Sequence, residues 1–237
     1  MKGLMQDWPL LVHTFIDHAS LHHSEREIVT RKVEGDIHRT NYLEIHSRAR
    51  KFSKALIKLG VKKSDVIGTL AWNTHRHLET WYGITGVGAI YHTLNPRLFL
   101  EQLEYIINHA DNKYIIADIT FVKILEGIES KLSNVKGFIF LTDSENMPET
   151  NLKNIFCYEE MINLEDDDYE WLKVEETDAC GLCYTSGTTG NPKGVLYSHK
   201  SNVLHTLVAN NADAMGIKST DSVMPVVPMF HANAWGL

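Results

Sequence analysis

A short segment near the end of the chain combines the side chains that bind phosphate groups. Residues 185–194 read Thr-Ser-Gly-Thr-Thr-Gly-Asn-Pro-Lys-Gly, which places four hydroxyls, three glycines and one lysine within ten residues. Glycines let backbone N–H groups approach an anion closely, hydroxyls donate further hydrogen bonds, and Lys193 adds a positive charge. A hydrogen bond to a charged group contributes about 1.5–3 kcal/mol, so several converging donors could hold a triphosphate. The segment therefore predicts a polyphosphate-binding loop.

Two other nucleotide-binding loops do not match this segment. A Walker loop needs a Gly-Lys-Ser/Thr end, whereas two residues separate Gly190 from Lys193, and Gly194 stands in place of the Ser or Thr. The dinucleotide fingerprint needs a Gly-x-Gly pair, which is missing before Gly187. A flexible linker is the remaining alternative, and the ordered elements expected on both sides of the segment disfavour it.

Hydrophobic periodicity predicts those elements. Apolar residues recur at helical spacing in several stretches, and the short apolar runs between them are typical of buried strands. The expected helices cover residues 40–60, capped by Thr40, then about 76–88, 100–107, 121–128 and 198–208, and the expected strands cover 66–71, 114–117, 138–141, 179–184 and 223–227. This alternation predicts an α/β fold with layered, parallel-rich sheets flanked by helices.

Between residues 142 and 178 the pattern weakens and predicts surface connections. The acidic run at 165–168 could bind a metal, but it lacks the glycine turn and ligand spacing of a calcium loop, so we expect a solvated loop. His22 and His23, like His75 and His77, have no convergent partners in the sequence, and we expect both pairs at the surface.

Composition and charge narrow the class of protein. The 237 residues are 43% hydrophobic and 22% charged, within the range of ordinary globular domains. The formal charge of -7, with no basic block, argues against a nucleic-acid surface and favours small-molecule partners. Neither a signal-peptide pattern nor a run of about 20 apolar residues occurs, so we expect a soluble, cytoplasmic protein without a transmembrane segment.

The three cysteines are too few for a secreted disulfide framework, which favours a reducing compartment. Cys180 and Cys183 could form a redox pair or half of a zinc site. No second Cys/His pair stands at zinc spacing, and residues three apart on a strand point to opposite faces, so we expect both thiols to pack inside the strand.

Several segments resemble one enzyme superfamily. Residues 184–194 resemble the phosphate-binding signature of the acyl- and aryl-CoA synthetases, nonribosomal adenylation domains and luciferases. Residues 228–236, Pro-Met-Phe-His-Ala-Asn-Ala-Trp-Gly, are similar to the second signature as medium- and long-chain acyl-CoA synthetases carry it, and residues 70–73 and 95–98 resemble N-terminal blocks of that branch. Within the branch, residues 182–184, 195–199 and 226–231 are most similar to bacterial 3-(methylthio)propanoate-CoA ligases and their fatty-acid relatives.

The resemblance implies an ATP-dependent acid-CoA ligase. Such enzymes activate a carboxylic acid, here a fatty or short thioether acid, as an acyl adenylate with ATP and Mg²⁺, and then form the thioester with coenzyme A. Carried over by position, Thr185 would help hold Mg²⁺ and the phosphates, His231 would stand beside the acyl adenylate, and Trp235 would gate the acyl tunnel. The residues that would wrap the β and γ phosphates are Ser186, Gly187, Thr188, Thr189, Gly190 and Lys193. Lys193 and His231 are the candidate catalytic residues, and simple packing is the alternative for His231 and Trp235.

The superfamily pattern extends past Leu237. The resemblance therefore implies that residues 1–237 are the N-terminal part of the AMP-binding (adenylation) domain, without the rest of that domain and the small C-terminal domain, and that this part alone has weak or no turnover. Two alternatives stay open: a nonenzymatic ATP-binding module, and a truncated fragment without a catalytic role.

Related fatty-acyl enzymes pair through N-terminal segments, so a homodimer through residues 1–15 is a further expectation.

Overall fold

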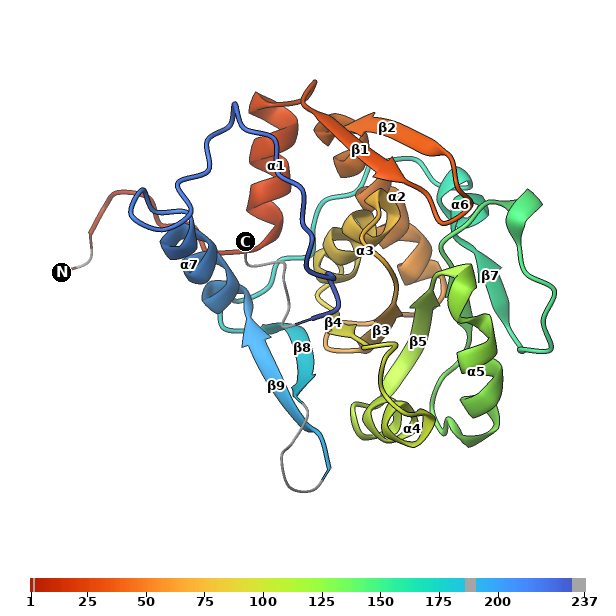
Figure 1. The fold of residues 1–237 in the computed structure, drawn as a ribbon. Coiled ribbons are helices and arrows are strands. Elements are labelled where there is room, and N and C mark those ends of the chain that lie inside the picture. The colour runs from red at the N-terminus through yellow and green to blue at the C-terminus, as the bar shows by residue number, and fades with distance from the viewer. Residues whose placement is uncertain (2, 186–190, 232–237) are drawn as a thin grey trace.

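A mostly parallel sheet forms the centre of the molecule. The computed structural model describes residues 1, 3–185 and 191–231, and within them seven strands are ordered β7-β6-β5-β3-β4-β8-β9 (Figure 1). Neighbouring strands are parallel except β8 and β9, which form an antiparallel hairpin. The strands are β3 (Val66–Leu70), β4 (Ile90–Thr93), β5 (Asn112–Ala117), β6 (Phe138–Phe140), β7 (Ile155–Cys157), β8 (Ala179–Thr185) and β9 (Lys193–Ser198). The predicted parallel-rich α/β fold is confirmed.

Helices cover both faces of this sheet (Figure 1). One face packs against the helical layer of α1 (His13–His22), α2 (Tyr42–Lys58), α3 (His75–Gly86) and α6 (Tyr158–Asn163), and the other against α4 (Leu100–His109) and α5 (Val122–Ile128). Side chains of the strands alternate between the two layers, so that Ile116 of β5 joins the first core and Ile115 the second. The helix α7 (His199–Ala209) follows β9 and matches the helix predicted over residues 198–208, with Ser198 as its N-cap.

The two long helices α2 and α3 pack closely against each other. The predicted apolar stripe of α2 is buried, but Asn41, and not Thr40, caps the helix, because the Asn41 side chain accepts a 2.9 Å hydrogen bond from the Glu44 N–H. The Thr40 hydroxyl instead donates to the Glu44 carboxylate at 2.7 Å. α3 continues through Gly83, where a Cβ atom would stand 2.7 Å from the Phe52 ring, so the glycine permits the close approach of the helices.

Several elements carry no strong periodicity and were not expected. The antiparallel hairpin of β1 (Glu27–Arg31) and β2 (Ile37–Asn41) is largely polar and exposed. β4 contains Tyr91, His92 and Thr93, whose side chains carry polar groups, although all four residues of the strand are buried. β7 has only three residues, β9 is mostly exposed, and α6 is short. Short 3₁₀ turns occupy residues 119–121, 129–131 and 144–146.

Two further sequence-based predictions are wrong, besides the helix cap at Thr40. His75 and His77 are 2% and 0% exposed and do not lie on the surface, because α3 is sandwiched between α2 and the rest of the core and buries nearly all of its circumference. Residues 223–227 form no strand. Pro225 has no N–H to donate to a ladder, and none of the described strands runs alongside this segment.

The predicted packing of Cys180 and Cys183 inside the protein agrees with the structure. Cys157, Cys180 and Cys183 are buried free thiols. In the acidic run, exposed Asp166 pairs with Lys54, as expected of a solvated loop, whereas Glu165 is buried and pairs with Lys58, which differs from that expectation. Among the described residues, no group of three or more His, Cys, Asp or Glu side chains could hold a metal ion. In the same part of the chain, no helix combines the length and apolar character that crossing a bilayer requires.

Candidate functional site at the carboxyl edge of the sheet

The carboxyl ends of the parallel strands carry the loops with the candidate residues. The loop after β3 leads to α3 on one face, whereas the loops after the neighbouring strands β4 and β5 lead to α4 and α5 on the other face. This change of direction is a topological switch point, where open α/β sheets bind their ligands. β8 ends at the same edge, because it pairs in parallel with β4.

The β8–β9 hairpin holds the two ends of the predicted phosphate loop together. Thr185 is the last residue of β8 and Lys193 the first of β9, and they are direct partners in the ladder. The Thr185 hydroxyl donates to the Lys193 carbonyl at 3.5 Å. Both side chains are exposed, and Lys193 has no ion-pair partner among the described residues. The hairpin thus presents a hydroxyl and an ammonium group to solvent at one place.

Aromatic packing fixes the base of this hairpin. Gly194 pairs with Tyr184 across the ladder, and a Cβ atom at Gly194 would lie 3.0 Å from the Tyr184 ring. The Tyr184 hydroxyl is 2.6 Å from Nδ1 of His109 at the end of α4, and the rings of Tyr184 and His92 are 5.2 Å apart. The last glycine of the motif therefore serves strand packing beneath the loop.

A buried carboxylate supports the loop after β3. Asp118 follows β5, is 1% exposed, and accepts a 2.6 Å hydrogen bond from the Trp72 N–H. Burial raises the pKa of the Asp118 carboxyl to about 7, although the Trp72 hydrogen bond opposes the shift. The Trp72 indole donates to the Thr120 hydroxyl at 3.0 Å. Sequence periodicity gave no indication of Asp118, because an aspartate after a strand usually signals a solvated turn.

The segment that carries His231 returns to this loop. The Asn73 side chain contacts the backbone of residues 225–229, and Phe230 is buried with its ring centroid 6.1 Å from that of Trp72 (the blue end of the chain beside α3 in Figure 1). The structure thus joins residues 70–73 and 228–231, two segments that the resemblance singled out separately. His231 is exposed, and its N–H donates to the Pro228 carbonyl at 2.9 Å.

The remaining predicted site residues lie outside the described part of the chain. They are Ser186, Gly187, Thr188, Thr189, Gly190 and Trp235. Among the described residues, no hydrogen bond, ion pair or ring contact joins Thr185 or Lys193 to His231. The structure therefore brings Thr185 together with Lys193, and it places residues 225–230, which directly precede His231, against the loop after β3.

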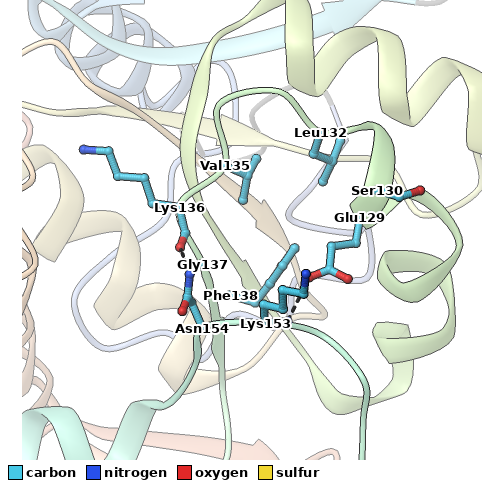
Figure 2. Close-up of a pocket in the computed structure, with 9 residues that line it drawn as sticks. All are labelled: Glu129, Ser130, Leu132, Val135, Lys136, Gly137, Phe138, Lys153 and Asn154. Carbon is cyan, nitrogen blue, oxygen red and sulfur yellow. Dashed lines mark hydrogen bonds between the residues drawn. The ribbon is translucent and has the colours of Figure 1, made fainter.

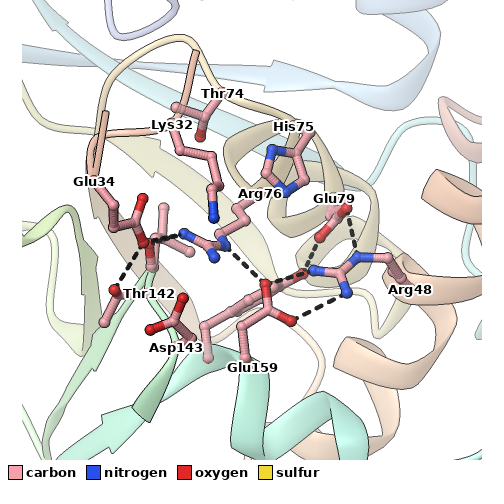
Figure 3. Close-up of polar contacts among 12 residues, drawn as sticks. Lys32, Glu34, Arg48, Thr74, His75, Arg76, Glu79, Thr142, Asp143 and Glu159 are labelled. Carbon is pink, nitrogen blue, oxygen red and sulfur yellow. Dashed lines mark hydrogen bonds and ion pairs between the residues drawn. The ribbon is translucent and has the colours of Figure 1, made fainter. Parts of the chain in front are cut away.

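A largely buried charged network joins the helices of the layer behind this edge (Figure 3). Arg48 of α2 bonds Glu79 of α3 and Glu159 of α6, each at 2.8 Å. Arg76 bonds the same Glu159 at 2.8 Å and reaches Glu34, in the β1–β2 turn, at 2.6 Å. These ion pairs hold the pKa of Glu34 and Glu159 below its usual value in spite of burial. One clue stood in the sequence: Arg48 falls on the apolar stripe of α2, where a charge needs a partner.

A cavity lies at the opposite edge of the sheet (Figure 2). It has a volume of about 280 Å³ and is lined by Glu129, Ser130, Leu132, Val135, Lys136, Gly137, Phe138, Lys153 and Asn154. Phe138 begins β6 and Asn154 precedes β7, so the cavity opens at the amino ends of these strands. It is separate from the loops that carry the candidate residues.

Comparison with known proteins identifies the family. The sequence profile of the AMP-binding enzyme family matches residues 16–237. The chain belongs to the AMP-binding enzyme family. Its sequence is 48% identical over 236 residues to a 3-methylmercaptopropionyl-CoA ligase of Ruegeria lacuscaerulensis, and 44% identical over 236 residues to a medium-chain-fatty-acid-CoA ligase of Ectopseudomonas oleovorans. The matches cover 100% of this chain but only 44% and 43% of the two proteins, so the chain spans less than half the length of these curated relatives.

Solved structures show the same fold. An anthranilate CoA ligase in complex with anthranoyl-AMP matches with a TM-score of 0.83 at 22% identity, over 94% of this chain and 42% of that one. A long-chain-fatty-acid-CoA ligase from Archaeoglobus fulgidus matches with a TM-score of 0.82 at 23% identity, over 98% of this chain and 45% of that one. The resemblance drawn from the motifs is confirmed, both in the family and in the branch to which the relatives belong.

Proposed function

We propose that the protein is an ATP-dependent acid-CoA ligase that activates a fatty or short thioether carboxylic acid as its acyl adenylate and then forms the acyl-CoA thioester. The observation that carries the proposal is the hairpin in which Thr185 and Lys193 face each other at the mouth of the Gly/Ser/Thr loop. The names of the relatives, a 3-methylmercaptopropionyl-CoA ligase and fatty-acid-CoA ligases, support the class of acid.

The residues at the hairpin fit a magnesium nucleotide. Attack of a carboxylate on the α-phosphorus releases pyrophosphate, so negative charge must be neutralised where it develops. Lys193 supplies an exposed positive charge, and the exposed Thr185 hydroxyl is a hard oxygen ligand beside it. Mg²⁺ is commonly held by one or two protein oxygens together with substrate phosphates, which this donor set suits. The ion would offset phosphate charge when bound.

His231 is proposed to act on the carboxylate side of the site. Its imidazole is exposed at the end of a turn whose preceding residue, Phe230, is buried under Trp72. A side chain anchored in this way can donate a hydrogen bond to a carboxylate or stack against a planar acyl group. The proposed roles of Ser186–Gly190 around the phosphates and of Trp235 at the acyl tunnel rest on the sequence motifs alone.

The test is acid-dependent exchange between ATP and pyrophosphate in the complete protein, with a panel of straight-chain and thioether acids. We expect exchange with at least one acid of the panel. Lys193→Ala should lower the rate about 10²–10³-fold, the usual loss for one preorganised group in contact with developing charge. Lys136→Ala, at the opposite edge of the sheet, is the matched control and should keep the wild-type rate.

The same experiment separates the alternatives. Binding of magnesium-ATP in calorimetry without exchange for any acid would favour a nonenzymatic ATP-binding module. Absence of both binding and exchange in the complete protein would remove the ligase assignment, whereas their presence there and their absence in residues 1–237 alone would favour a truncated fragment without a catalytic role. A homodimer through residues 1–15 is a separate expectation, which sedimentation equilibrium of the complete protein tests.

A further inference from the structure

Asn73 makes three hydrogen bonds to one distant segment of backbone. Its side-chain N–H₂ group donates to the carbonyls of Pro225 and Val227 at 3.0 and 2.9 Å. Its carbonyl oxygen accepts from the Met229 N–H at 2.6 Å. Both donor hydrogens of the amide are thus used, together with its acceptor. No other side-chain type has this combination of donors and acceptor at this length.

The segment that Asn73 holds has little other support in the described part of the chain. Residues 223–227 form neither helix nor strand, and Val223, Met224, Val226 and Val227 are each at least half exposed. Pro225 and Pro228 interrupt any regular ladder because they lack an N–H. After this segment, Phe230 is the next anchor, buried under Trp72.

Asn73 is itself fixed from both sides. Before it, the Trp72 N–H is bonded to buried Asp118. After it, the Thr74 hydroxyl accepts from the His77 N–H and caps α3. A residue between two anchored neighbours cannot follow the motion of a segment that it binds, so the position of Asn73 is imposed on residues 225–229.

We propose that Asn73 is a positioning residue that holds residues 225–229 against the loop after β3 and thereby sets the place of His231 for the acid substrate. The second half of this inference rests on the proposed ligase function, and the first half does not. Asn73 acts through the backbone of the segment and need not touch the substrate.

The experiment compares Asn73→Ala and Asn73→Asp with the wild-type protein in two measurements. The first is amide hydrogen exchange of residues 225–231. We expect the Met229 amide, protected in the wild type, to exchange at least about tenfold faster in Asn73→Ala, since a lost bond of about 1.4 kcal/mol corresponds to a factor of ten. Asn73→Asp keeps the acceptor for Met229 but loses both donors, so it should retain part of this protection. It also keeps the size of the side chain, which serves if Asn73→Ala fails to fold.

The second measurement is steady-state kinetics. In Asn73→Ala we expect kcat/KM for the acid to fall about 10- to 100-fold, the loss typical of a misplaced active-site group, while KM for ATP stays within about twofold of the wild-type value. Asn108→Ala is the matched control, because Asn108 also uses both ends of its amide to bind a loop, donating to the Lys131 carbonyl and accepting from the Ser133 N–H, each at 2.9 Å. The Asn108→Ala variant should lose a similar free energy of unfolding, but its hydrogen exchange at residues 225–231 and its kcat/KM for the acid should equal those of the wild type.

Each outcome decides the inference. Unchanged exchange at Met229 in both Asn73 variants would overturn it, as would an equal loss of kcat/KM in Asn108→Ala. If the wild-type protein catalyses no acid-dependent reaction, the proposed function and the role of His231 fail together. The exchange data alone then decide whether Asn73 holds the segment.

Discussion

At the scale of single residues, burial changes how side chains at the carboxyl edge titrate. Asp118 is held under the loop after β3, and burial raises the pKa of its carboxyl to about 7. In the unfolded chain the pKa of an aspartate is about 3.9. The folded state therefore binds this proton more tightly than the unfolded state. The contribution of the protonated Asp118 carboxyl to the free energy of unfolding is complete below about pH 4 and is lost as the pH rises through 7.

Asp118→Asn isolates this effect. The amide keeps an oxygen that can accept from the Trp72 N–H and cannot ionise. We expect the variant to exceed the wild type in free energy of unfolding by on the order of 4 kcal/mol at pH 8, with a difference that shrinks steadily towards pH 4. Urea unfolding at pH 4.5, 6 and 8 measures it. Asp213→Asn, an exposed control, should show no such trend, and a pH-independent difference at Asp118 would contradict the prediction.

At the scale of elements, the β8–β9 hairpin depends on the contact between Gly194 and Tyr184. The two residues are paired in the ladder, and a Cβ atom at 194 would come within 3.0 Å of the Tyr184 ring, so the ring would have to shift. Because Tyr184 also bonds His109 of α4, a displaced ring would move the hairpin relative to that helix.

Gly194→Ala should therefore destabilise the protein by about 1–3 kcal/mol, the usual cost of overpacking. Tyr184→Leu removes the ring, so the double variant should recover part of the loss, a coupling that a double-mutant cycle in urea unfolding detects. Gly127→Ala in α5 is the control, since its Cβ would have ordinary contacts, and it should be neutral or slightly stabilising. Additive effects of Gly194→Ala and Tyr184→Leu would disprove the contact.

The elements also show why sequence patterns predicted only part of this structure. β5 and β6 are continuous apolar runs and α2 has a clear stripe, so burial follows directly from their periodicity. β4 was missed because His92 and Thr93 are polar residues that the fold buries. The segment 223–227 is as apolar as a strand, yet a strand exists only where a neighbour completes its hydrogen bonds.

The site was predictable to a similar degree. The phosphate loop stood out because its chemistry is concentrated in ten consecutive residues. The partners of Asn73 lie 152–156 positions away along the chain, and the partner of Asp118 lies 46 positions away. Such long-range contacts leave no local pattern in a single sequence.

At the scale of the whole molecule, several histidines are buried in the neutral form. Burial lowers the pKa of His77, His92 and His199 to about 4, and that of His75 to about 2 with help from nearby positive groups. In the unfolded chain these imidazoles take up protons below about pH 6.5. Their contribution to stability is therefore present above that pH and is lost as the pH falls towards 4.

We expect acid unfolding well above the pKa of ordinary carboxylates. At pH 5 the four histidines each gain a proton on unfolding and Asp118 loses one, which leaves a net uptake of about three protons and a fall in the free energy of unfolding of on the order of 4 kcal/mol per pH unit. Urea titrations between pH 7 and 5 measure this slope. His22→Gln, which changes an exposed imidazole of α1, should leave it unaltered, and equal midpoints at pH 7 and 5 in the wild type would refute the expectation.

The strand order also has a consequence for folding of the chain during its synthesis on the ribosome. β4 is bordered by β3 and β8, but residues 94–178 must be synthesised between β4 and β8. At 5–20 residues per second, one side of β4 stays without its neighbour for roughly 4–17 seconds. During that interval the edge of β4 that will later pair with β8 has unpaired N–H and C=O groups. This edge is where binding of a ribosome-associated chaperone would best prevent aggregation of the nascent chain.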